Sequence, residues 1–146
     1  MEFENTSKTY YLNKLTYINL RWIAIIGQFI TINSVKFIFE FEFNFILANI
    51  IVFLGAVSNL FLIYFFKKTQ LSNKVSFNFL ILDIFQLSFL LYLTGGTINP
   101  FSIFLIIPSI FASNSLNLKT NILLIILTII SIIFLAFIHE ELPSPL

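Results

Sequence analysis

The sequence predicts an all-α membrane protein, a polytopic bundle of five transmembrane helices with a cytoplasmic N-terminus. Three observations lead to this prediction. Of the 146 residues, 58% are hydrophobic and only 10% are charged, whereas soluble domains carry about 25% charged residues. The mean hydropathy is +0.97. Apolar stretches long enough to cross about 30 Å of hydrocarbon alternate with short polar breaks along the chain.

Each predicted span is an apolar stretch between charged or turn-forming residues. The five spans cover residues 18–35, 45–66, 75–94, 101–118 and 121–138. The breaks between them are short, so successive helices are expected to be antiparallel neighbours. Residues 1–17 form a cytoplasmic or interfacial N-terminal segment, and residues 139–146 form an extracytoplasmic tail in which Pro143 and Pro145 prevent further helix.

The orientation prediction rests on the distribution of Lys and Arg, which favour the cytoplasmic side of a membrane. With the N-terminus inside, seven of the eight basic residues lie on the cytoplasmic side and only Lys36 lies outside. The cytoplasmic set is Lys8, Lys14, Arg21, Lys67, Lys68, Lys74 and Lys119. Aromatic residues gather at the same end, as is typical of the headgroup level: Tyr10, Tyr11, Tyr17 and Trp22.

Polar side chains inside the predicted spans need a partner or a task. Among the ionisable residues, Asp83 is the one that lies well inside a predicted span. Gln86 follows three positions later, on the same helix face. Gln28 on the first span and Asn59 on the second fall at comparable depth. Two interpretations stay open, a polar clamp between helices and a role in binding a ligand or a proton.

Two further residues mark the last two spans. Pro108 lies inside the fourth span and removes one backbone donor, so we expect a kink and a Phe104 carbonyl without its usual partner. His139 ends the fifth span at the predicted outer surface. It is either an ordinary interfacial histidine or a proton donor to a ligand in the outer leaflet.

The segment from Thr94 to Phe101 is not explained by burying a helix in lipid. Gly95 and Gly96 end the third helix and permit positive φ, while Asn99 is a good N-cap residue in front of Pro100. One interpretation is a tight turn with good capping. The other is a binding site, because free backbone amides, an Asn side chain and a helix N-terminus would direct donors at one spot beside an apolar wall. A lipophilic carbonyl compound such as a quinone would suit it.

The run GGTINPF at 95–101 resembles the GGxxNPF heptapeptide in the membrane domain of RegB-type (PrrB, ActS) redox-sensing histidine kinases. The resemblance extends over most of the chain from about Leu20. Further motifs carry it: Leu20-Arg21-Trp22 with Gly27-Gln28, Asp83 with Leu91-Tyr92-Leu93-Thr94, Pro108, and His139 with Leu142-Pro143.

The resemblance implies a membrane input domain of a two-component system that binds ubiquinone and reports the redox state of the quinone pool. It makes Gly95, Gly96, Asn99, Pro100 and Phe101 the quinone-binding candidates, supported by Asp83, Gln28, Gln86 and His139. It also implies a homodimer in the inner membrane of a bacterium, with a response regulator reached only through a kinase domain.

This sequence departs from the family pattern in several respects. The family has a sixth span, a phosphoacceptor-histidine helix, an ATP-binding domain and a redox-active cysteine, and we find none of these here, which suggests a truncated product or a fragment. His139 is predicted to be outside the cell and is therefore not the phosphoacceptor.

Other function classes receive less support. A small transporter, or its membrane subunit, would use Asp83 as coupling carboxylate, and the Gly and Pro interruptions of spans three and four favour it. A structural anchor would need no site. Catalysis within this chain is not expected, because no nucleophile–base pair or phosphate-binding loop is found. Zero cysteines and one histidine argue against a metal site, and a net charge of +1 against nucleic-acid binding.

Overall fold

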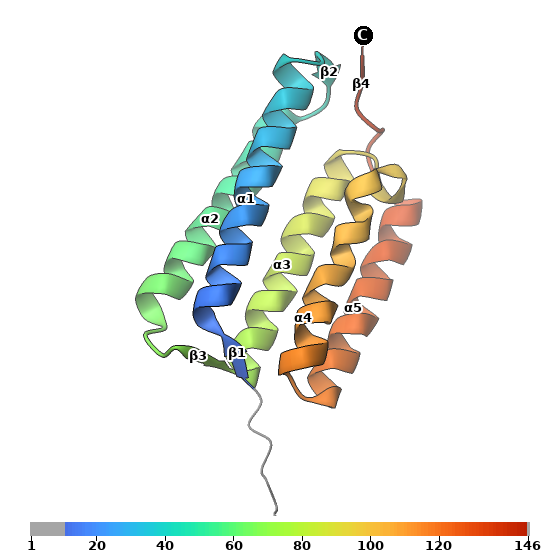
Figure 1. Ribbon diagram of the computed structural model, residues 1–146. Coiled ribbons are helices and arrows are strands. Elements are labelled where there is room, and N and C mark those ends of the chain that lie inside the picture. Colours follow the sequence, from blue (N-terminus) through green and yellow to red (C-terminus); the bar gives the residue numbers. More distant parts are fainter. Residues whose placement is uncertain (1–10, 146) are drawn as a thin grey trace, which may run out of the picture.

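The computed structural model describes residues 11–145 and consists almost entirely of helices (Figure 1). The predicted positions of Lys8 and Tyr10, and most of the segment 1–17, lie outside the described residues. Four long helices have the length and hydropathy of membrane spans. They are α1 (Lys14–Phe37), α2 (Phe45–Phe65), α3 (Asn73–Leu93) and α5 (Leu118–Phe137).

Helices α1, α3 and α5 begin earlier than the apolar stretches predicted, because polar caps determine where they start. Asn13 Oδ1 accepts a hydrogen bond from the Thr16 amide at 3.0 Å, so α1 begins four residues before the predicted Ile18. Asn117 Oδ1 accepts from the Thr120 amide at 2.8 Å, so α5 begins at Leu118 instead of residue 121. Each cap satisfies a backbone donor that the helix leaves free.

The fourth apolar segment is a broken helix. After a short 3₁₀ turn η1 (Gly96–Ile98), the 3₁₀ helix η2 (Pro100–Ile106) leads into α4 (Ile107–Ser115). The expected orphan at Phe104 does not arise, because its carbonyl accepts from the Ile107 amide in a 3₁₀ pattern. Seven residues of η2 at about 2.0 Å and nine of α4 at about 1.5 Å reach roughly 27 Å, close to the hydrocarbon thickness. The count of five spans remains a prediction.

Helix α3 lies between two pairs of helices (Figure 1). It packs against α2 of the α1–α2 hairpin on one side and against α4 and α5 on the other. Large apolar side chains form the core of the bundle. Among the most buried are Leu62, Leu80, Ile84, Leu91, Leu105, Leu124 and Leu135. Other large apolar residues face outward along every long helix, as a bilayer requires; Phe53, Phe85 and Ile130 are examples.

Two short strand pairs tie the ends of the bundle. At the N-terminal end, β1 (Tyr11–Asn13) pairs antiparallel with β3 (Gln70–Ser72). At the opposite end, β2 (Phe41–Glu42) in the α1–α2 connection pairs with β4 (Ser144–Pro145) in the C-terminal tail. The tail therefore lies at the same end as the heptapeptide, as the antiparallel order of the segments predicts.

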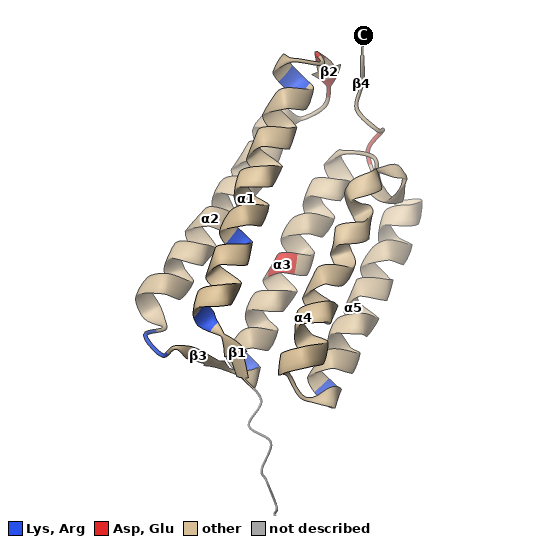
Figure 2. Cartoon of the chain, in the orientation of Figure 1, with Lys and Arg blue, Asp and Glu red and all other residues tan. Residues whose placement is uncertain are grey.

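Most charged residues lie at one of the two ends of the bundle, with opposite signs at the two ends (Figure 2). The β1–β3 end carries basic residues, and these are Lys14, Lys67, Lys68, Lys74 and Lys119. The heptapeptide end carries Lys36 and most of the described acidic residues, Glu40, Glu42, Glu140 and Glu141. This separation is the pattern on which the orientation prediction depends, with the basic end in the cytoplasm.

Candidate functional site

The two glycines of the heptapeptide make a turn that packs tightly against α5 and the tail. Gly95 has φ +104° and Gly96 has φ +60°, as the sequence predicts for this turn. A Cβ on Gly96 would lie 2.5 Å from the Leu135 carbonyl oxygen, and one on Gly95 would lie 2.7 Å from Leu142 Cδ1. Both glycines are thus needed for close approach, and neither lines the cavity described below.

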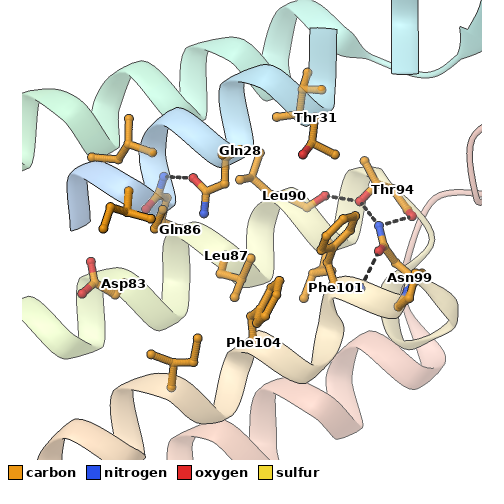
Figure 3. A pocket seen from close by; sticks show the side chains of 18 of the residues that line it. Gln28, Thr31, Asp83, Gln86, Leu87, Leu90, Thr94, Asn99, Phe101 and Phe104 are labelled. Carbon is orange, nitrogen blue, oxygen red and sulfur yellow. Dashed lines mark hydrogen bonds between the residues drawn. The ribbon is translucent and has the colours of Figure 1, made fainter. Parts of the chain in front are cut away.

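Asn99 caps η2, but its side chain is fully occupied within the turn. Its Oδ1 accepts from the Phe101 amide at 2.9 Å. Its Nδ2 donates to the Thr94 carbonyl at 3.0 Å and to Thr94 Oγ1 at 2.9 Å (Figure 3). Of the two interpretations open for this turn, the hydrogen bonds agree with good capping and not with an amide that points at a ligand. In the structure its donors hold the end of α3 to the start of η2.

We expect Asn99→Ala to lower the free energy of unfolding by about 1–2 kcal/mol, since the cap and the links to Thr94 are lost together. Melting of the helical circular dichroism signal in detergent micelles measures it. Asn114→Ala is the matched control, because Asn114 is an exposed residue inside α4 and Ala is the better helix former. Equal stability of the two variants would contradict the role of Asn99.

A cavity of about 780 Å³ lies between α1, α3 and the broken fourth helix. Asn99, Pro100 and Phe101 of the heptapeptide line it, together with Phe104 and Pro108 further along the fourth segment. The rings of Phe101 and Phe104 both point into this space (Figure 3). The walls are mostly aliphatic and aromatic, and the volume falls within the range that accommodates a small organic ligand.

Two glutamines lie on the cavity wall opposite the heptapeptide. Gln86 Nε2 on α3 donates to Gln28 Oε1 on α1 at 3.0 Å, and both side chains line the cavity. Gly55 on α2 makes room for this contact, because a Cβ there would lie 2.5 Å from Gln86 Nε2. The polar-clamp interpretation therefore holds for Gln28 and Gln86, which join two helices.

An ion pair lines the end of the cavity nearest the N-terminal side. Arg21 Nη2 lies 2.9 Å from Asp83 Oδ1, and Arg21 Nε donates to the same oxygen at 3.0 Å. Tyr17 donates its hydroxyl to the other carboxylate oxygen. Arg21 also donates to Asn59 Oδ1 at 3.3 Å and Ser58 Oγ at 2.7 Å, so the network joins α1, α2 and α3.

This network corrects the sequence analysis in one respect. Arg21 was counted with the basic residues near the cytoplasmic helix ends, and Asp83 alone was placed well inside a span. Instead, Arg21 is only 6% exposed and lies inside the bundle as the partner of Asp83. A coupling carboxylate has to exchange its proton or ion during transport, whereas Asp83 is held by Tyr17 and Arg21. This arrangement disfavours the transporter hypothesis.

The C-terminal tail covers the heptapeptide end of the cavity. Leu142 and Pro143 line the cavity there, and the Glu140 amide donates to the Tyr92 carbonyl at the end of α3 at 2.8 Å. His139 is not among the lining residues. Its ring packs against the backbone of Gly96, and its Nδ1 lies 2.8 Å from the Glu140 carbonyl oxygen.

Six of the nine candidate residues therefore line one cavity, namely Gln28, Asp83, Gln86, Asn99, Pro100 and Phe101. Gly95, Gly96 and His139 do not line the cavity and instead pack in the turn between the heptapeptide, α5 and the tail. Phe104 lines the cavity as part of the apolar wall that the sequence predicts beside the turn. Tyr17 and Thr31 also line it and were missed, because no local pattern relates them to the heptapeptide. Leu142 was noted only as part of the resemblance.

Comparison with known proteins identifies a relative. The sensor histidine kinase RegB of Cereibacter sphaeroides is 30% identical over 125 residues, which cover 85% of this chain and 27% of RegB. The chain is therefore a homologue of one part of RegB. The resemblance based on the heptapeptide is thus confirmed, and it agrees with a multi-pass membrane sensor domain. The chain spans about a quarter of the length of RegB. No protein-family profile and no solved structure matches it.

Proposed function

We propose that this chain is a membrane input domain that binds ubiquinone between α1, α3 and the heptapeptide and reports its redox state to a histidine kinase. The observation that carries the proposal is the position of the heptapeptide: Asn99, Pro100 and Phe101 form one wall of a cavity of about 780 Å³. An apolar chamber with a few polar groups is the usual form of a small-molecule site.

The residues of the cavity suit a quinone in three ways. The rings of Phe101 and Phe104 offer faces for stacking against a flat head group. The aliphatic side chains of α1 and α3 suit an isoprenoid tail, because they resemble the lipid around it. Gln28 and Thr31 supply polar groups within this apolar surface. When bound, a quinone presents carbonyl oxygens in its oxidised form and hydroxyl groups in its reduced form.

Signalling requires that the two forms favour different helix packings, since a ligand with equal affinity for both states shifts nothing. The cavity is suited to this, because its walls come from three separate segments. Helix α1 meets α3 there through Gln28 and Gln86 and through Arg21 and Asp83. A small change in the separation of these helices would reach the basic end of the bundle, which we propose faces the cytoplasm.

The remaining parts of the proposal concern its setting. We place the domain in the inner membrane of a bacterium, acting as a homodimer, with the heptapeptide on the periplasmic side. A kinase module on the cytoplasmic side would pass the signal to a response regulator. Labelling of single-cysteine variants at Thr97 and Thr69 tests the orientation, because the chain has no cysteine of its own. The proposal requires impermeant reagents outside the cell to label position 97 and not position 69.

We expect Phe101→Ala to weaken binding of a short-chain ubiquinone about tenfold, because the variant loses the stacking face and its apolar contact. The full chain is purified into liposomes, and binding is followed by quenching of Trp22, its sole tryptophan. Phe137→Ala is the control, since Phe137 is 84% exposed on α5 and lies outside the cavity lining. Equal affinity of the two variants would argue against this site, and absence of saturable binding to the unmodified chain would refute the proposed function.

A further inference from the structure

The polar groups along the cavity differ in how much hydrogen-bonding capacity they have left. Both donors and the acceptor of the Asn99 amide are used within the turn. The Thr94 hydroxyl donates to the Leu90 carbonyl and accepts from Asn99. The Asp83 carboxylate is bound by Arg21 and Tyr17. None of these groups offers an unused donor to a ligand.

The Gln28–Gln86 pair does keep capacity. One hydrogen bond joins the two amides, from Gln86 Nε2 to Gln28 Oε1. Among the described residues, Gln28 Nε2 and Gln86 Oε1 have no hydrogen-bond partner, and the free nitrogen of Gln28 points into the cavity (Figure 3). Thr31, one turn along α1, also lines the cavity. Its hydroxyl also has no hydrogen-bond partner among the described residues, so it keeps a donor and acceptor capacity as well. The amide pair differs from it in placing an unused donor and an unused acceptor on two helices, α1 and α3.

We propose that the Gln28–Gln86 pair holds an oxygen of the quinone head group and distinguishes its oxidised from its reduced form. This inference rests on the proposed function. A quinone carbonyl only accepts hydrogen bonds, so it suits the amide nitrogen that Gln28 now presents. A quinol hydroxyl also donates, and it suits an amide oxygen in that place.

The pair can change from one form to the other without losing its own hydrogen bond. If both side-chain amides rotate by half a turn, Gln28 Nε2 donates to Gln86 Oε1 and Gln28 Oε1 faces the cavity. The two rotations are coupled, because rotation of one amide alone would set two oxygens or two NH₂ groups against each other. The redox form of the occupant thus determines the orientation of both amides.

The rotation would change the contact between the Gln86 amide and α2. The Gln86 amide lies directly against the backbone of Gly55, where a Cβ would be 2.5 Å from its nitrogen and 3.1 Å from its oxygen. Because the Gln86 amide packs on the bare backbone of Gly55, exchange of its NH₂ group for an oxygen there changes the contact with α2. The pair is therefore a two-state element at the meeting point of α1, α3 and α2, which is what a ligand-driven switch requires.

The test compares Gln28→Leu and Gln86→Leu with the unmodified full chain in liposomes. Oxidised and reduced short-chain ubiquinone are each titrated by equilibrium dialysis, with correction for partition into protein-free liposomes. We expect Gln28→Leu to weaken binding of the oxidised form about tenfold, as for the loss of one good hydrogen bond in an apolar site. We expect Gln86→Leu to change the ratio of the two dissociation constants at least threefold.

Matched controls are available on the same chain. Gln70→Leu replaces the remaining glutamine, which is exposed in β3 at the opposite end, and should leave both affinities unchanged. Thr31→Val removes the neighbouring hydroxyl and should cost less than Gln28→Leu. Melting of the circular dichroism signal checks that each variant folds, and Leu is well tolerated in a membrane helix.

The outcomes separate this inference from the proposed function. Normal affinities in both Gln variants, together with weak binding in Phe101→Ala, would overturn the role of the pair and leave the quinone site standing. A larger loss in Thr31→Val than in Gln28→Leu would overturn it as well. Absence of saturable binding to the unmodified chain would refute the proposed function and this inference together.

Discussion

Replacing Asp83 by Leu is expected to lower the free energy of unfolding by about 3–5 kcal/mol, because it leaves the Arg21 guanidinium buried without its counter-ion. Arg21 is only 6% exposed, and Asp83 is its one charged partner among the described residues, joined to it by two contacts. Unfolding by sodium dodecyl sulfate in mixed micelles, followed by circular dichroism, measures the change.

The double variant Arg21→Leu with Asp83→Leu distinguishes an ion pair from general damage to the core. Removing both charges removes the unpaired group as well, so we expect it to recover most of the stability lost in Asp83→Leu. A double variant as unstable as the single one would show that the two residues are not coupled.

An exposed ion pair on the same chain provides the control. Lys36 Nζ lies 3.4 Å from Glu42 Oε1 at the heptapeptide end, and Glu42 is more than half exposed. Pairs of this kind contribute at most about 1 kcal/mol. Glu42→Leu should therefore change the stability much less than Asp83→Leu. Similar losses in both variants would mean that burial does not determine the effect.

Local features of the sequence predicted most of the fold. The apolar stretches located the helices, since length and hydropathy are read directly along the chain. The cap at Asn99 and the positive φ of Gly95 were also predicted, because a turn depends on neighbouring residues. The predicted helix starts were wrong because they were taken from hydropathy alone. Lys14 and Leu118 belong to helices because Asn13 and Asn117 cap them, and hydropathy does not register a cap.

The contacts that give the site its character come from distant parts of the chain. Arg21 and Asp83 are separated by 62 residues, and Gln28 and Gln86 by 58. No local pattern shows that such residues face each other, so Arg21 was counted only as a cytoplasmic-side charge and its pairing with Asp83 was not predicted. Asn99 is a different case, because its partner Thr94 lies only five residues earlier, within the same turn. There the sequence left capping and ligand binding both open, and only the structure shows which contacts the amide makes.

The local heptapeptide turn and the long-range residue pairs meet in one cavity. The heptapeptide forms its wall at one end, the glutamine pair lies along it, and the Arg21–Asp83 pair lines the other end. A ligand at the heptapeptide therefore shares one continuous space with both polar links between α1 and α3. The position of the turn that holds the heptapeptide depends in turn on how closely Gly96 approaches α5.

We expect Gly96→Ala to lower the free energy of unfolding by about 2–4 kcal/mol, from left-handed backbone strain and overpacking together. The added Cβ would lie 2.5 Å from the Leu135 carbonyl oxygen and 2.7 Å from His139 Cγ, and a helix backbone cannot move aside cheaply. The turn should shift away from α5 and carry Phe101 with it, so quinone affinity should fall as well. Detergent unfolding and the quenching of Trp22 measure the two effects.

Gly27→Ala is the matched control for stability, because a Cβ at Gly27 in α1 meets nothing within 4 Å. In the middle of a helix this change should be neutral or stabilise by up to about 1 kcal/mol. If Gly96→Ala were as stable as Gly27→Ala, the close packing of the turn on α5 would be wrong. If Gly96→Ala lost stability but bound quinone normally, the turn would support the fold without positioning the ligand. The contact of Phe101 with quinone would then not depend on the packing of the turn on α5.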